Sequence, residues 1–287
     1  MKKLIVFAAI AAMVIPFVSC NNKIDYGDGP QAKIEKAKYT EVAKKVTIKE
    51  GTVSTTQGIK EIEFTDGGRY IITRNQGTKA EGDEILTGTY RIENLIYILE
   101  NFGSVEFGSD GSLTIKLTNG DTVTGSYEEE EKAPSNDYNN ALAHTWKIDR
   151  IDISVDADGK NVGVVIDGCD LEKIAKDLIK KAKDTYNVEI DINLAALKGY
   201  EIKYLTISSY NTFMVEFTGA DTFKGTMQGI NGYKFNYKLE NGEGNELLNA
   251  EAECTFTPKS ATTAWLQVNV KSDNFSGRII FQMSLAE

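Results

Sequence analysis

Histidine, cysteine and proline are scarce in this sequence, which has one His, three Cys and four Pro among 287 residues. Zinc sites and Ser-His-Asp or Cys-His catalytic groups therefore lack most of their usual parts, and the lone His144 is expected to be a structural or a surface residue. The formal net charge is −10, so nucleic acid, which needs clustered Lys and Arg, is not an expected partner. Phosphate-loop, Cys-x-x-Cys and His-Glu-x-x-His motifs do not occur. We therefore expect a protein without cofactor, metal or enzymatic activity.

The composition that remains is that of a globular protein, with 41% hydrophobic and 26% charged residues. This excludes collagen, low-complexity sequence and wholesale disorder. The length allows one large domain or two small ones, each able to bury a core.

The first twenty residues have the pattern of a secretory leader. Lys2 and Lys3 form a short positive segment, and Leu4–Val18 is an apolar run too short to span a bilayer comfortably. The run ends in the sequence FVSC at 17–20, which resembles the lipobox of bacterial lipoproteins. In that family the leader is removed before the Cys, which then carries the lipid chains. An ordinary secretory leader with an incidental Cys is the alternative.

The lipobox resemblance implies that residues 1–19 are a signal peptide and that Cys20 carries palmitate-type acyl chains that bind the membrane. Several chains on one residue hold a protein durably, at about 0.8 kcal/mol per buried CH₂. Residues 20–38 are then a tether, and the mature chain has net charge −12. Asn21 replaces the Asp that retains such proteins at the inner membrane, so the resemblance favours the outer membrane and leaves its periplasmic or outer face open.

Alternation of apolar and polar residues predicts β-strands from Val42 onward. Residues 233–240 alternate completely, and 112–118 repeats the pattern. Turn signals such as Asp66-Gly67-Gly68 separate consecutive runs and supply the positive φ that tight hairpins need. Strand after strand, with one face apolar and the other polar, predicts antiparallel meanders.

One amphipathic helix is predicted over 171–186, because apolar residues recur there at helical spacing. A shorter helical turn is predicted over 194–198. The acidic run 128–140 predicts a linker between an N-terminal β domain at 39–127 and a C-terminal β domain at 141–287. Short matches between the two halves leave duplication and convergence both open.

The segment LAHTWKI at 142–148, followed by hairpins such as FTGADTFKGT at 217–226, resembles lipocalin-like lipoproteins of bacteria. In that group a Trp on the first strand packs across the base of a closed antiparallel barrel, and Trp146 takes that position. The resemblance implies a barrel but no particular activity. The predicted fold class is therefore mainly β, with two antiparallel meander units, the second a lipocalin-like barrel with one amphipathic helix.

Two further features leave alternatives open. Outside the cytoplasm two thiols in one domain often pair, so Cys169 and Cys254 are read either as a disulfide or as two buried free thiols. Residues 156–161 place oxygens at alternate positions, as a calcium loop does, but lack its downstream Glu. An Asp-Gly hairpin turn is the favoured interpretation there.

Trp146 and Trp265 are the candidate ligand contacts, because the face of a Trp ring can stack on an apolar ligand or a sugar. The leading hypothesis is a non-catalytic binding lipoprotein that takes one small apolar or neutral ligand in a barrel mouth. The acidic net charge disfavours anionic ligands. A surface interaction module for glycan or protein partners is the alternative, and an enzyme with two converging carboxylates is a third. The sequence leaves the oligomeric state open.

Overall fold

The computed structural model describes residues 33–49, 58–75, 83–134, 137–157, 160–187, 189, 194–219, 221–239, 251–272 and 275–286. The chain forms two compact units. The N-terminal unit comprises residues 36–145 and 206–212, and the C-terminal unit comprises residues 1–35, 146–205 and 213–287. The predicted C-terminal domain is thus interrupted at 206–212, a short segment that belongs to the first unit. The predicted signal peptide and Cys20 lie outside the described residues.

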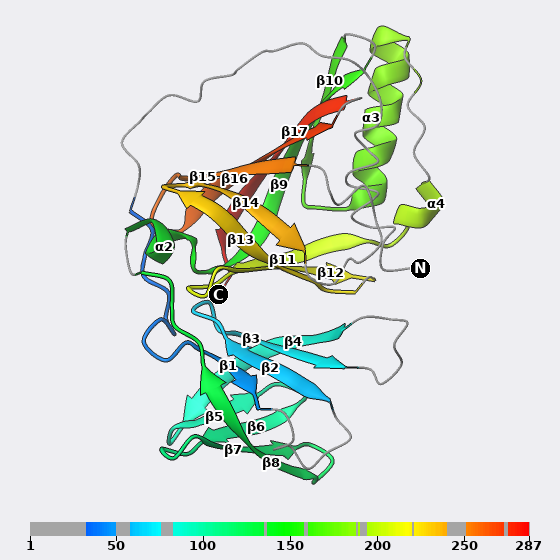
Figure 1. The fold of residues 1–287 in the computed structure, drawn as a ribbon. Coiled ribbons are helices and arrows are strands. Elements are labelled where there is room, and N and C mark those ends of the chain that lie inside the picture. The colour runs from blue at the N-terminus through cyan, green and yellow to red at the C-terminus, as the bar shows by residue number, and fades with distance from the viewer. Residues whose placement is uncertain are drawn as a thin grey trace. The chain divides into compact units, whose positions relative to one another are not determined.

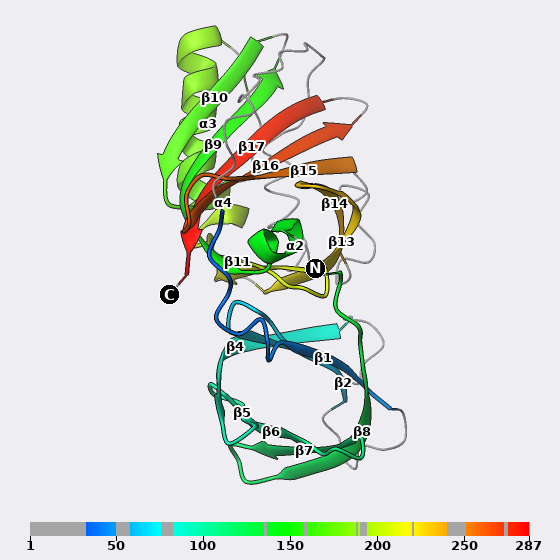
Figure 2. The ribbon, with the colours of Figure 1, turned by 90° about the vertical axis from the view of Figure 1, so that its left-hand side faces the viewer.

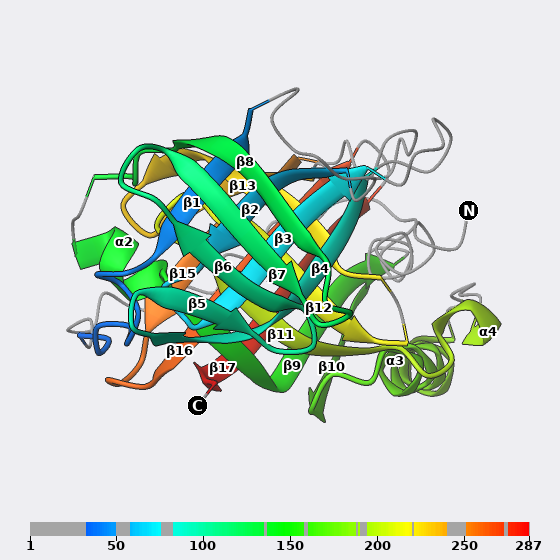
Figure 3. The same ribbon diagram turned by 90° about the horizontal axis from the view of Figure 1, so that it is seen from below.

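The N-terminal unit contains a closed antiparallel barrel of eight strands in sequential order, which Figure 2 shows as a ring. Each strand pairs with the next, and β1 closes the barrel by pairing with β8. The strands are β1 (Lys44–Ile48), β2 (Ile59–Phe64), β3 (Arg69–Asn75), β4 (Asp83–Glu93), β5 (Ile96–Leu99), β6 (Gly103–Phe107), β7 (Ser112–Leu117) and β8 (Thr122–Glu129). Figure 3 shows β5 to β8 side by side, in the order of their hydrogen bonds.

The predicted turn at Asp66-Gly67-Gly68 joins β2 to β3. Gly68 has φ +79°, a conformation that glycine adopts without strain, and its N–H donates to the Thr65 carbonyl at 3.1 Å. The turn places Phe64 opposite Tyr70 and Ile62 opposite Ile72. This register puts the apolar residues of both strands on the same, inner face.

Aromatic rings fill the inner face of this barrel. Phe64 is completely buried, and its ring centroid lies 4.1 Å from that of Tyr97, 5.1 Å from Tyr90 and 6.0 Å from Phe107. Branched residues at alternate strand positions complete the core, among them Val46, Ile62, Ile72, Val105 and Ile115.

The C-terminal unit also contains a closed antiparallel barrel. Eight strands follow the order β9-β11-β12-β13-β14-β15-β16-β17, β17 pairs back onto β9, and β10 pairs with the C-terminal half of β9 (Figure 1). The strands are β9 (Thr145–Ala157), β10 (Lys160–Asp167), β11 (Glu201–Ile207), β12 (Thr212–Thr218), β13 (Phe223–Asn231), β14 (Lys234–Leu239), β15 (Glu251–Pro258), β16 (Thr263–Ser272) and β17 (Phe275–Leu285). The predicted fold class is confirmed, and the first unit is a closed barrel as well.

The predicted amphipathic helix is confirmed as α3 (Leu171–Tyr186), which packs against β10. The carboxylate of Asp170 caps its first turn by accepting from the Lys173 N–H at 3.0 Å. Asn187 ends the helix in the left-handed conformation, with φ 54°. Two short helices, α2 (Asp137–Leu142) and α4 (Leu194–Leu197), complete the described elements.

The predicted linker at 128–140 is more ordered than a solvated acidic run. β8 continues to Glu129 and α2 begins at Asp137. Carboxylates of the run meet lysines of β1, because Glu129 pairs with Lys44, and Glu130 with Lys45 at 3.1 Å. Glu128, Glu129 and Glu131 are nevertheless exposed, and what the sequence pattern missed is the cross-strand lysine partners of the run.

Candidate ligand-binding site

The two predicted tryptophan contacts lie in different surroundings within the C-terminal barrel. Trp146, near the start of β9, is completely buried, and its ring meets that of Phe256 edge-on with centroids 5.4 Å apart. Trp265, on β16, is half-buried and lies on the opposite face from its buried neighbours Ala264 and Leu266. The Nζ of Lys259 lies 4.1 Å from the Trp265 ring centroid. A role for either ring in ligand binding stays a prediction.

The two candidate disulfide partners are buried free thiols. The carbonyl of Cys169 accepts from Ile202 on β11, whereas Cys254 lies on β15 opposite Phe235 and Val268. Three strands separate β11 from β15 in either direction around the barrel. A disulfide requires Cα atoms within about 7 Å, so this placement does not allow one. Burial raises the pKa of the Cys254 thiol to about 12, with a smaller contribution from Glu253.

The calcium-loop alternative falls on the β9–β10 hairpin, where Ala157 pairs with Lys160. That pairing agrees with the favoured Asp-Gly turn, although residues 158–159 themselves lie outside the described residues. Among the described residues, no three His, Cys, Asp or Glu side chains gather as metal ligands. His144 is buried, and its carbonyl accepts from the Ile207 N–H at 2.9 Å.

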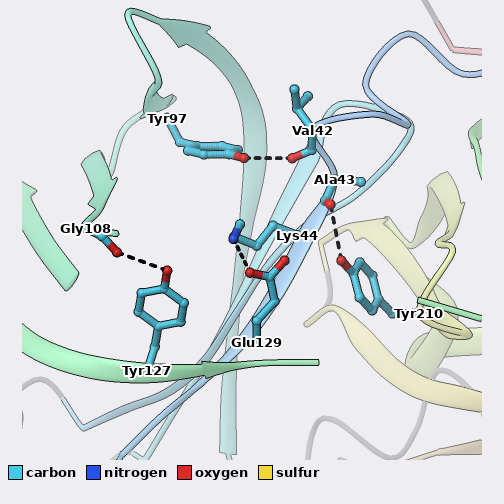
Figure 4. Close-up of polar contacts among 8 residues, drawn as sticks. All are labelled: Val42, Ala43, Lys44, Tyr97, Gly108, Tyr127, Glu129 and Tyr210. Carbon is cyan, nitrogen blue, oxygen red and sulfur yellow. Dashed lines mark hydrogen bonds and ion pairs between the residues drawn. The ribbon is translucent and has the colours of Figure 1, made fainter. Parts of the chain in front are cut away.

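Five side chains form what we call the inner aromatic site of the N-terminal barrel: Lys44, Tyr97, Phe107, Tyr127 and Glu129 (Figure 4 labels all but Phe107). Side chains of a strand alternate between its faces, so strand position assigns each of them to the inner face. On β1, Lys44 shares a face with the buried Val46 and Ile48. On β8, Glu129 and Tyr127 share the face of the buried Val123. On β5 and β6, Tyr97 and Phe107 share faces with buried Leu99 and Val105.

A single ion pair lies among the rings of the inner aromatic site. The Lys44 ammonium pairs with the Glu129 carboxylate. Its Nζ also lies 5.1 Å from the ring centroid of Phe107 and 5.6 Å from that of Tyr127, within reach of cation–π attraction. The rings of Phe107 and Tyr127 meet edge-on, with centroids 5.0 Å apart. Figure 4 shows Tyr97 and Tyr127 on two sides of the ion pair.

Solvent reaches this part of the barrel interior. The side chain of Glu129 is 48% exposed and that of Lys44 is 21% exposed, although both point to the inner face. Phe107 and Tyr127 are only partly buried. By contrast, Phe64, whose ring contacts those of Tyr97 and Phe107, is completely buried. The inner aromatic site therefore combines partly exposed polar and aromatic side chains with the buried core of the barrel.

Hydrogen bonds fix the tyrosines of the site. The Tyr97 hydroxyl donates to the Val42 carbonyl at 2.8 Å, and the Tyr127 hydroxyl lies 3.5 Å from the Gly108 carbonyl (Figure 4). Burial, followed by the nearby charge of Glu129, raises the pKa of Tyr97 to about 12. Tyr97 therefore stays a neutral hydrogen-bond donor throughout the physiological range.

A second polar cluster in the N-terminal unit is buried rather than accessible. The Thr212 hydroxyl donates to Glu63 Oε2 at 2.6 Å, and the Ser209 N–H donates to Asp66 Oδ2 at 2.8 Å. The Tyr210 hydroxyl donates to the Ala43 carbonyl at 3.2 Å (Figure 4). These bonds hold segment 206–212 in place. They explain why it belongs to this unit, and they indicate a structural role.

Sequence reasoning missed the inner aromatic site for a specific reason. The sequence pattern that could have indicated the site is a lysine on the apolar face of a strand. Lys44, Val46 and Ile48 alternate with polar residues, so the three share one face. Its partner Glu129 was hidden within the run interpreted as a linker. Recognising that Glu129 continues the alternation of Val123 and Tyr127 would have placed it on the same inner face.

No protein-family profile matches the chain, and no curated protein matches it. Among solved structures, the chain is similar to a mutant of the vaccine antigen Transferrin Binding Protein B from Haemophilus parasuis, at 10% identity and a TM-score of 0.26. That match covers 85% of this chain and 45% of the other, so this chain spans less than half the length of that protein. It is also similar to a protein of unknown function from the DUF3598 family of Nostoc punctiforme, at 9% identity and a TM-score of 0.21, covering 85% of this chain and 94% of that one. Scores this low define neither a family nor a function.

Proposed function

We propose that this protein is a non-catalytic, lipid-anchored protein of the bacterial outer membrane that binds a small apolar or neutral ligand in its N-terminal barrel. The observation that carries the binding proposal is the inner aromatic site, where partly exposed rings surround one ion pair inside a closed barrel. Small-molecule sites typically combine apolar and aromatic walls with a few converging polar groups.

The ion pair defines the chemistry of the ligand. Lys44 and Glu129 cancel each other's charge, so an ionic ligand would have to break the pair. The pair still offers spare N–H donors and carboxylate lone pairs to a hydroxyl or amide group. A neutral molecule with an aromatic or apolar body and one such group fits this arrangement.

The membrane anchor is supported by the sequence of the leader. Among the described residues, no helix has the length and apolar character needed to cross a bilayer. Membrane partitioning of the full-length product in a Gram-negative host, compared with a Cys20→Ser variant, tests the anchor. We expect the variant to leave the detergent-extracted membrane fraction, and equal partitioning of the two would contradict the anchor.

The ligand is tested with two neutral probes that differ by one hydroxyl, 2-naphthol and naphthalene, in equilibrium dialysis against residues 21–287. A hydrogen bond to a charged group contributes about 1.5–3 kcal/mol. We therefore expect tighter binding of 2-naphthol, by roughly tenfold or more. The double variant Lys44→Met/Glu129→Gln should keep naphthalene binding and reduce this preference, because the Gln side chain offers only neutral hydrogen-bonding groups.

The matched control uses the Lys49–Glu128 ion pair, 3.1 Å apart. Lys49 directly follows β1 and Glu128 precedes Glu129 on β8, so strand alternation assigns both to the outer face. Lys49→Met/Glu128→Gln changes the same residue types and should leave the preference intact. Absence of saturable binding of either probe to the wild type would defeat the proposal. So would an equal loss of preference in both double variants.

The alternative is a surface interaction module for glycan or protein partners. Its supporting observation is Trp265, which lies on the outer face of the C-terminal barrel beside Thr257 and Gln282 on the neighbouring strands. Oligosaccharide binding that is lost in Trp265→Ala, with no binding of the naphthalene probes, would favour it.

A further inference from the structure

The outer side of α3 carries a stripe of exposed lysines. Their spacing of three, four and three residues keeps them on one side of the helix over about 15 Å. They are Lys173, Lys176, Lys180 and Lys183, which we call the lysine stripe, and all four are exposed.

The lysine stripe stands out against an acidic protein. The chain has a net charge of −10, yet the polar face of α3 holds five lysines, Lys181 included. Lys176 pairs with Glu172 at 2.5 Å, and Asp177 and Asp184 flank the stripe on one side. The five lysines still outnumber the three acidic residues of the helix, Glu172, Asp177 and Asp184, so residues 171–186 carry a net charge of +2.

The apolar side of α3 is already occupied within its own unit. Leu171, Ile174 and Leu178 are buried, and the helix packs against β10. The helix therefore cannot turn its apolar face into a bilayer without leaving the C-terminal unit. Its lysines can meet a charged surface only from outside, by electrostatic attraction.

We infer that the lysine stripe docks the C-terminal unit on an anionic phospholipid surface. Clusters of four to eight basic residues on an amphipathic helix bind anionic lipids, and each lysine near such a surface adds to the attraction. The inference rests on the proposed anchoring through Cys20, because an anchor holds the helix at a high effective concentration near lipid headgroups.

The test separates docking from anchoring by using the unlipidated chain 21–287, which contains every described element. Sedimentation with vesicles of phosphatidylglycerol and phosphatidylcholine is compared with vesicles of phosphatidylcholine alone. We expect binding only to the anionic vesicles, weakening steeply between 50 and 300 mM salt because exposed charges are screened. Replacing the four stripe lysines by Gln should lower the partition coefficient by roughly 100-fold.

A matched control replaces four exposed lysines elsewhere in the same unit by Gln: Lys147, Lys203, Lys234 and Lys238. It changes the net charge equally and should keep most of the vesicle binding. Gln is a good helix former, and circular dichroism checks that both variants stay folded.

Three results would overturn the inference. One is no binding of the wild-type chain to anionic vesicles at 50 mM salt. Another is an equal loss of binding in the stripe and control variants. A third is tighter binding to heparin or DNA than to vesicles of equal anionic charge, which would assign the stripe to a polyanionic macromolecule. Failure of the Cys20 anchor would appear only in the partitioning of the full-length product.

Discussion

The two barrels have similar strand arrangements and different interiors. In the N-terminal barrel, an ion pair and partly exposed rings face inward beside the buried Phe64. In the C-terminal barrel, Trp146, Phe256 and Cys254 are buried together with aliphatic residues. Closing a meander into a barrel therefore does not decide which side chains fill its interior. The residues on alternate strand positions decide it.

The sharpest way to test this comparison is to remove one completely buried ring from each interior. Truncating a buried aromatic residue to Ala costs about 3–5 kcal/mol. We expect Phe64→Ala and Trp146→Ala each to lower the free energy of unfolding by that amount, measured by urea denaturation. Trp265→Ala, at a half-buried position on the outer face, should cost about 1 kcal/mol. A cost for Trp146→Ala no larger than that for Trp265→Ala would contradict the packed interior of the second barrel.

The buried carboxyl group of Glu63 in the N-terminal unit should make the free energy of unfolding depend on pH. Burial raises the pKa of Glu63 above its ordinary value of 4.5, and Lys45, Ser208 and Thr212 only partly oppose this. A carboxyl with a higher pKa in the folded state binds more protons there, so its stabilisation is present below the unfolded pKa. That stabilisation is lost as the pH rises through the folded pKa.

We therefore expect Glu63→Gln to reduce the decline in unfolding free energy between pH 4.5 and 8. Among the described residues, Glu63 Oε1 has no hydrogen-bond partner. Removing the charge should stabilise the protein by about 1–3 kcal/mol at pH 7, while Lys45 keeps Glu61 and Glu130 as partners. Glu128→Gln, at an exposed position on β8, is the control. If the unfolding free energy depends on pH in the same way in Glu63→Gln and in the wild type, Glu63 is not the group that causes the decline.

A smaller effect on stability is expected at the first turn of α3, a helix of the C-terminal unit. Asp170→Ala removes the acceptor of the Lys173 N–H and should cost about 1 kcal/mol. Asp170→Asn keeps an oxygen at that position and should recover most of the loss. Equal stability of the Ala variant and the wild type, measured by thermal unfolding, would show that the cap does not contribute.

The smallest expected effect separates binding from folding in the first barrel. Ion pairs with solvent-exposed members contribute about 0–1 kcal/mol to stability. Lys44→Met/Glu129→Gln should therefore change the unfolding free energy by less than about 1 kcal/mol while it reduces the preference for 2-naphthol. A loss of several kcal/mol would indicate that the pair is a structural element instead.

Strong periodic patterns in the sequence predicted the fold well. The helix at 171–186 was predicted with the observed bounds, because its apolar spacing and its cap act locally. The hairpin at Asp66-Gly67-Gly68 was also predicted, because glycine sets the turn. Features that depend on distant partners were missed. Glu129 gains its inward position only by pairing with β1, 85 residues earlier. The pairing of Cys169 and Cys254 was left open, because spacing along the chain does not encode how far apart the two thiols lie in the fold.

The location of the two tryptophans gives the protein a built-in optical label. Trp146 and Trp265 both lie in the C-terminal unit, and residues 36–145 and 206–212 contain none. Tryptophan emission therefore reports on the second barrel alone, whereas far-ultraviolet circular dichroism reports on both. If the barrels unfold independently, the two signals will give separate denaturation curves, and the difference between them will isolate the first barrel without any added dye or engineered probe.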